Sequence, residues 1–193
     1  MKKIALIAMT AAAAIATPAM AQNVTGTINI TGTVGAKCYV GSNPDGSTFG
    51  TTVALEELAN PDGTLKDSGT LATKFGTAGG SGLTAKVVCN GAAPNVTVTA
   101  DPLKNAAIAD ANVPEGYNNT VNYKAAVTFT LATGVATVND VSGGAGTAQS
   151  LASGLSTTAT TNVSVATSDW VAPGVLIAGA YAGKITILIK PAA

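Results

Sequence analysis

The feature that most constrains this fold is a period-two alternation of residues that recurs along almost the whole chain. Valine and threonine alternate at 96–99, and isoleucine takes every second position at 185–189. Successive side chains of a strand point to opposite faces, so alternation rich in β-branched residues predicts half-buried strands. Strands are predicted at 24–31, 87–89, 96–100, 121–131, 162–166 and 184–190. No segment holds a convincing 3.6-residue period, and 53–59 is expected to form a short helix at most.

Turn-forming sequences separate these strands. Nearly identical pentapeptides at 43–47 and 60–64 place proline, aspartate and glycine in the order that suits a type I turn, and they bracket a further element over 49–58. Segments 76–82 and 142–154 are rich in glycine, serine and alanine, which predicts loops, the second long enough to be mobile. Short strands joined by such loops predict a single all-β sandwich.

The first 21 residues have the pattern of a secretory signal peptide. Two lysines at 2–3 precede an uncharged apolar run over 4–16, and small residues at 19 and 21 suit cleavage after Ala21. The apolar run is shorter than the roughly 20 residues that span a bilayer. We therefore expect the mature chain to begin at Gln22, to be exported through the periplasm and to have no transmembrane segment.

Cys38 and Cys89 are the two cysteines of the chain. An exported chain meets an oxidising compartment, where an even number of cysteines favours a disulfide. The bridge would close a loop of 89 − 38 = 51 residues, for which the chain-entropy model gives about 4 kcal/mol. The alternative is a pair of free buried thiols.

The composition argues against an enzyme. The chain contains no histidine and no arginine, so the commonest general base and transition-metal ligand is missing. Oxidised cysteines leave no thiolate nucleophile and no zinc cluster. Adjacent Glu56 and Glu57 would face opposite sides of a strand, and the turn aspartates lack the alternating carboxylates of a calcium site. Eight scattered lysines in the mature chain do not form a nucleic-acid surface. We expect no catalytic residue, metal, cofactor or nucleic-acid partner.

Three stretches, taken in order, resemble a known family. They are the alternating run 24–30 that leads to Cys38, the run Val87-Val88-Cys89-Asn90-Gly91 followed by Pro94 and the alternating 96–100, and Ala178-Gly179-Ala180-Tyr181 before 184–190. Together they resemble the chaperone–usher pilins of the archaic type, the branch that includes spore coat protein U domains. The resemblance covers nearly the whole mature chain.

This resemblance implies an immunoglobulin-like, pilin-type β-sandwich that lacks its last strand and carries an N-terminal donor strand. A periplasmic chaperone would lend a strand, and the next subunit's extension would replace it at an outer-membrane usher, so that the chain self-polymerises into a surface fimbria that serves cell adhesion. Residues 22–36 would be the donor strand or extension, 37–193 the sandwich, and Cys38–Cys89 the family disulfide. The residues implied to fill the neighbour's groove are Val24, Gly26, Ile28 and Ile30.

The alternative is a secreted monomeric β-sandwich that binds a carbohydrate or a surface partner. Such sites favour aromatic platforms, and the five largest aromatic side chains show no clustering in the sequence: Tyr39, Tyr117, Tyr123, Trp170 and Tyr181. Trp170 is expected in the core or at its rim rather than on a sugar-binding face.

Overall fold

The computed structural model describes residues 27–41 and 46–192. The chain divides into a short unit, 1–34, and a compact unit, 35–193. The described part of the short unit has no regular secondary structure. The described helices and strands all belong to the compact unit.

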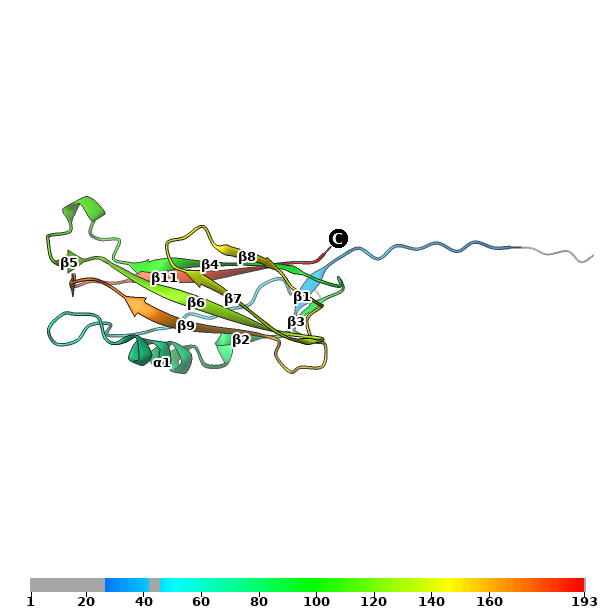
Figure 1. The fold of residues 1–193 in the computed structure, drawn as a ribbon, viewed down its shortest axis with the longest axis horizontal. Coiled ribbons are helices and arrows are strands. Elements are labelled where there is room, and N and C mark those ends of the chain that lie inside the picture. The colour runs from blue at the N-terminus through cyan, green and yellow to red at the C-terminus, as the bar shows by residue number, and fades with distance from the viewer. Residues whose placement is uncertain (1–26, 42–45, 193) are drawn as a thin grey trace, which may run out of the picture. The chain divides into compact units, whose positions relative to one another are not determined.

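The compact unit consists mainly of antiparallel strands, as the alternation predicts (Figure 1). One sheet has the order β7 (Gly134–Val141), β6 (Thr120–Leu131), β9 (Val163–Val171) and β2 (Thr84–Ala85). The other has the order β8 (Thr147–Ser150), β4 (Asn95–Lys104) and β11 (Ala182–Lys190). The two sheets join at one corner, where the end of β4 pairs with the start of β6 through Leu103–Val121 and Lys104–Thr120.

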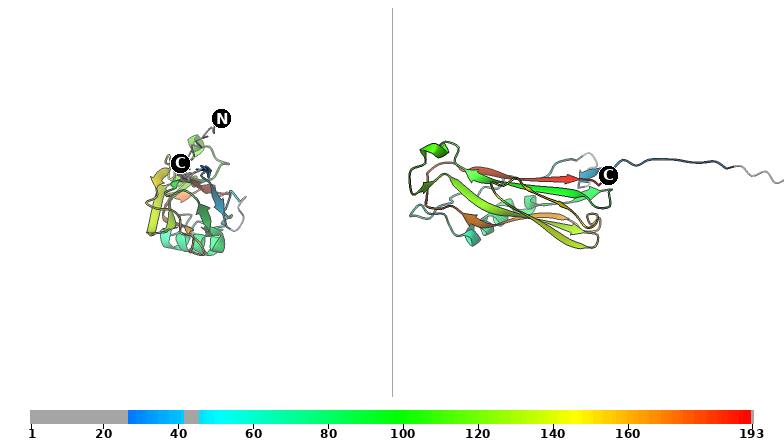
Figure 2. Two further views of the ribbon diagram at one scale, coloured as in Figure 1. Left: turned by 90° about the vertical axis from the view of Figure 1, so that its right-hand side faces the viewer. Right: turned by 45° about the horizontal axis from the view of Figure 1, so that its top comes forward.

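Two short pairs of strands complete the unit. β1 (Cys38–Val40) pairs antiparallel with β3 (Val87–Cys89), and β10 (Val175–Leu176) pairs parallel with β5 (Tyr117–Asn118). The sandwich therefore has two ends. Residues 35–41 and the C-terminal end of β11 lie at the end that we call the entry end, and the β5–β10 pair lies at the opposite, far end (Figures 1 and 2).

The core lies between the two sheets and follows the predicted alternation. Every second residue of β6 is buried, from Val121 to Leu131, and the inward face of β4 buries Val96, Val98 and Ala100. Phe129 is fully buried among these aliphatic side chains. The side chains at the alternating apolar positions of the sequence are thus the ones that fill the space between the two sheets.

The structure contains a helix that the sequence pattern did not predict. α1 (Ser68–Gly79) packs across β9 and buries Leu71 and Phe75. Asp67 caps its N-terminus by accepting a hydrogen bond from the Thr70 N–H at 2.9 Å, and this bond together with that from the Thr70 hydroxyl lowers the pKa of Asp67. The expected loop at 76–82 is wrong, because 76–79 end α1 and 80–82 belong to the 3-10 helix Gly80–Leu83 that follows.

One further expectation needs correction, and two agree with the structure. Segment 53–59, expected to form a short helix at most, forms none. Segment 142–154 is not one long loop, because β8 lies within it and pairs with β4. The turn at 60–64 is present, with the Asp62 carboxylate accepting hydrogen bonds from the backbone and hydroxyl of Thr64. The companion turn at 43–47 lies largely outside the described residues.

Among the residues that the structure describes, no helix is long and apolar enough to cross a membrane. A second 3-10 helix, Asp110–Asn112, lies in the loop between β4 and β5 at the far end.

Candidate functional site: an open groove beside the last strand

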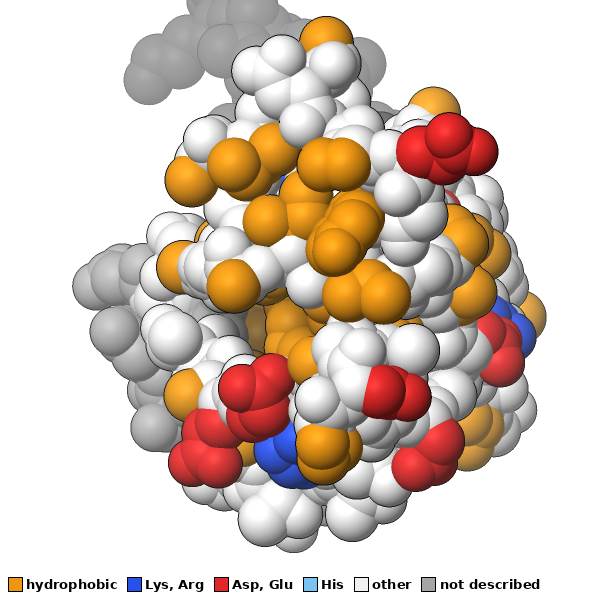
Figure 3. Space-filling model, turned by 90° about the vertical axis from the view of Figure 1, so that its left-hand side faces the viewer, with side chains coloured by type: hydrophobic (Ala, Val, Ile, Leu, Met, Phe, Trp, Pro, Cys, Tyr) orange, Lys and Arg blue, Asp and Glu red, His pale blue; other side chains and the backbone are white. Residues whose placement is uncertain are grey.

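A groove of about 980 Å³ runs along β11, between this strand and the extended segment 49–59. The apolar side chains of its lining include Leu83, Leu103 and Val165, together with Tyr123 and Trp170. The groove begins at the far end, beside residues 176–181. Figure 3 shows a hollow with hydrophobic side chains at this end.

One wall of the groove is an edge strand. β11 pairs with β4 along one side only, and in the described residues its other side forms no backbone hydrogen bond with any strand. Ile185, Ile187 and Ile189 point toward the core but stay partly exposed, whereas the facing residues of β4 are fully buried. The core-facing side chains of β11 are therefore left partly exposed, and a further strand beside β11 would cover them.

The opposite wall is the segment that follows β1. Leu55 and Leu58 are buried and Val53 is partly buried, which holds this segment against the core. Within the described part of the chain, however, residues 47–57 form no backbone-to-backbone hydrogen bond. The amino group of Lys74 donates to the Leu55 and Glu57 carbonyls at 3.3 and 3.2 Å, so side chains replace only part of the missing ladder.

A stacked aromatic pair forms the floor of the groove. The rings of Tyr123 and Trp170 lie 4.7 Å apart at 24°. Trp170 faces inward because β9 has an irregularity opposite 122–124: Asp169 adopts φ 51°, and Thr167 and Trp170 are both buried although they lie three residues apart. A bulge of this kind re-aims a side chain. The Ser68 hydroxyl fixes the turn by accepting from the Trp170 N–H at 2.9 Å.

The two aromatic side chains differ in how their polar atoms are satisfied. The Tyr123 hydroxyl donates toward the carbonyls of Asp101 and Lys184, at 2.9 and 3.2 Å, and so links β6 to β4 and β11. Burial, with smaller effects from Asp101 and Asp140, raises the pKa of Tyr123 to about 12. The Trp170 Nε1 is buried and has no hydrogen-bond partner among the described residues. A buried donor without an acceptor costs about 1–3 kcal/mol.

The predicted disulfide is confirmed. Cys38 and Cys89 are bonded and lie directly opposite each other in the β1–β3 register. Next to them, Asn90 accepts from the Lys37 N–H at 2.8 Å and donates to the Gly35 carbonyl at 2.8 Å. The first residues of the compact unit are thus fixed at the entry end.

The predicted donor residues belong to the other unit of the chain. Val24 and Gly26 lie outside the described residues. Ile28 and Ile30 are described; they have no regular secondary structure and are 88% and 91% exposed.

Sequence reasoning missed the aromatic pair, and although the family resemblance implied a groove, the sequence did not locate its walls. Tyr123 and Trp170 are 47 residues apart, and only the pairing of β6 with β9 brings them together. No cluster of three or more potential metal-ligating side chains occurs within 27–41 and 46–192. Glu56 and Glu57 lie beside the groove as exposed residues.

Comparison of the chain with protein-family models, with curated proteins and with solved structures finds no match.

Proposed function

We propose that this protein is a structural, pilin-like subunit that polymerises when the N-terminal segment of one copy fills the groove of another. The observation that carries the proposal is the open groove along β11: among the described residues, the groove side of β11 and residues 47–57 form no backbone hydrogen bond with another strand. An added strand satisfies such walls through main-chain hydrogen bonds, and alternate side chains fill the pockets.

The order of strands supports an immunoglobulin-like sandwich that lacks its last strand. β11 is the final strand and the edge of its sheet, while the chain after β1 borders the other side of the groove. A strand placed between them would join the two walls. It would also cover the three partly exposed isoleucines of β11 and could offer a carbonyl to the Trp170 Nε1.

Residues 22–33 have the pattern that such a groove requires. Apolar side chains at 24, 28 and 30 alternate with threonine and asparagine, and Gly26 allows close approach of the backbone. An exposed segment with several apolar side chains tends to pair with another chain unless a specific groove receives it. We propose a periplasmic chaperone as the first partner of the groove and an outer-membrane usher as the site of assembly, which would give a surface fimbria.

The arrangement of the aromatic residues argues against the carbohydrate-binding alternative. A sugar stacks on an exposed ring face, but Trp170 is 6% exposed and packs on Tyr123, which is 3% exposed. Tyr117 is half exposed and has no aromatic neighbour among the described residues. A strand that approaches with aliphatic side chains fits this groove better than a sugar ring does.

A pair of substitutions on opposite faces of the proposed donor strand tests the proposal. Ile28→Asp would bury an unpaired carboxylate in an apolar groove, at a cost of several kcal/mol per junction. Thr27→Asp, the matched control, adds the same charge to the face that points away. We expect Ile28→Asp to give a folded, disulfide-bonded monomer and Thr27→Asp to form oligomers like the wild type, as measured by gel filtration and by SDS-resistant ladders in unheated samples.

Two outcomes would contradict the proposal. If Ile28→Asp assembles as well as Thr27→Asp, this segment does not fill the groove. If Ile28→Asp fails to fold even as a monomer, measured by circular dichroism, residues 22–33 belong to the chain's own sheet and the monomeric alternative gains.

A further inference from the structure

The two ends of the compact unit carry opposite charge. At the far end, segments 56–67, 104–119 and 169–182 contain seven carboxylates and two lysines, and with Lys124, which pairs with Asp169, the balance is 3 − 7 = −4. At the entry end, the described segments 35–41, 86–95, 131–137, 147–162 and 188–192 contain three lysines, Lys37, Lys86 and Lys190, and no acidic residue. Lys37 and Lys190 are exposed.

The far end also exposes apolar side chains beside the groove. Figure 3 shows hydrophobic side chains gathered across this end with acidic side chains around them. Exposed members of the two loops that form it include Ala106, Ala107, Pro114, Tyr117, Pro173 and Ala178. Residues 178–181 line the groove as well, so this surface is continuous with the groove's opening.

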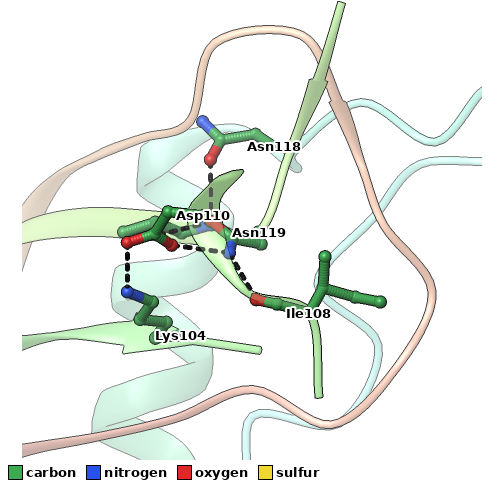
Figure 4. Close-up of polar contacts among 6 residues, drawn as sticks. Lys104, Ile108, Asp110, Asn118 and Asn119 are labelled. Carbon is green, nitrogen blue, oxygen red and sulfur yellow. Dashed lines mark hydrogen bonds and ion pairs between the residues drawn. The ribbon is translucent and has the colours of Figure 1, made fainter. Parts of the chain in front are cut away.

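The far end is held in shape by its own polar contacts (Figure 4). Lys104 and Asp110 form an ion pair at 2.7 Å, and Asn119 donates to both Asp110 and the Ile108 carbonyl at 2.9 Å. The Tyr181 hydroxyl donates to the Ile177 carbonyl at 2.9 Å. A surface fixed in this way loses little conformational entropy when a partner binds.

The direction of strand addition determines which surface meets the far end. Every pairing within the two main sheets is antiparallel. A donor strand that joins β11 in the same antiparallel sense would run toward the far end, and the body of the donating copy would follow there. Only residues 31–34 separate Ile30 from Gly35, and five residue steps reach at most about 18 Å. The donating copy must therefore place its own entry end close to the acceptor's far end.

We propose that the far end is a second interface between copies of this chain, on which the basic entry end of the next copy is seated. The inference rests on the proposed function, because strand donation brings the two ends together. Apolar contacts would stabilise this second interface, while complementary charge would orient the two copies as they associate and accelerate assembly. Each copy would then use both ends in a head-to-tail filament.

Charge substitutions in the mature chain test this second interface. Lys37→Gln/Lys190→Gln lowers the net charge by two at the entry end, and the control Thr73→Glu/Asn139→Asp lowers it by two at exposed positions of α1 and β7. We expect the first variant to assemble about tenfold more slowly than the wild type at low ionic strength. We expect the control to match the wild type, and all three rates to converge near 0.5 M salt.

A charge exchange makes the test stricter. Reversing the entry end alone, with Lys37→Glu/Lys190→Glu, should slow assembly further, and adding Glu56→Lys/Glu115→Lys at the far end should restore most of the rate. If the entry-end variant and the control slow assembly equally, or if the charge exchange restores none of the rate, the proposed second interface is refuted. If the wild type itself forms no filaments, strand donation fails instead, so the two failures are distinguishable.

Discussion

The Tyr123 hydroxyl should make the stability of this protein depend on pH in the alkaline range. The hydroxyl donates to carbonyls of β4 and β11, and burial raises its pKa from 10.0 to about 12. A tyrosine whose pKa is raised by folding contributes stability that is complete below pH 10 and is lost as pH rises toward 12. The full shift corresponds to at most about 2.7 kcal/mol.

Substitution by phenylalanine isolates this effect. At pH 8, Tyr123→Phe should lower the free energy of unfolding by about 1–2 kcal/mol, because two carbonyls lose a donor. Between pH 8 and pH 11 the wild type should lose about 1.4 kcal/mol that Tyr123→Phe does not lose. The two proteins should therefore have nearly equal stability at pH 11.

Urea unfolding followed by circular dichroism at both pH values measures this difference. Tyr117→Phe is the control, because Tyr117 is 51% exposed, and it should remain close to the wild type at both. A stability difference between Tyr123→Phe and the wild type that is the same at pH 8 and pH 11 would refute the assignment of the proton-linked group to Tyr123.

Two predictions concern the connections between strands. Asn162 is 1% exposed and exchanges hydrogen bonds with the backbone of Val87, so Asn162→Ala should lower the free energy of unfolding in urea by about 3 kcal/mol. The control Asn139→Ala, at an exposed position, should lower it by less than about 0.5 kcal/mol. Similar losses for both variants would contradict a structural role for the Asn162 hydrogen bonds. Cys38 and Cys89 are bonded, so titration of the denatured, unreduced protein isolated from a periplasmic extract should find no free thiol, and two thiols would show that the bridge does not form there.

The central strands could be predicted from the sequence because their periodicity is strong. β6 and β11 coincide closely with the predicted runs, and the predicted run 96–100 covers the first half of β4. In each of the three, apolar residues at alternate positions point toward the core. The disulfide was predictable from the number of cysteines and the signal sequence. These inferences depend on local pattern and on compartment, and neither requires knowledge of which strands are neighbours.

The helix escaped prediction for a local reason. α1 contains Gly69, Gly76 and Gly79 and three threonines, all of which disfavour helix. Its apolar contacts with β9 depend mainly on Leu71 and Phe75, too few to establish a 3.6-residue period. Packing against the sheet therefore outweighs intrinsic propensity in this segment.

The family resemblance implied a groove, but its position could not be predicted because it arises between segments that are distant in sequence. Its walls, 49–59 and β11, are separated by more than a hundred residues. Its floor depends on the irregularity at Asp169, which turns Trp170 inward. An alternation pattern gives no information about a strand that the sheet lacks. The open edge of β11 therefore becomes visible only when the pairing of every described strand is known.

Photo-crosslinking in isotopically mixed filaments tests the central claim most directly. Mature protein with a benzophenone amino acid at position 28 would be assembled with ¹⁵N-labelled protein that lacks it, and the linked peptides would be identified by mass spectrometry. Strand donation predicts links from position 28 of an unlabelled copy to β11 or to 49–59 of a ¹⁵N-labelled copy. Links confined to one copy, or links between copies that avoid both walls of the groove, would contradict it.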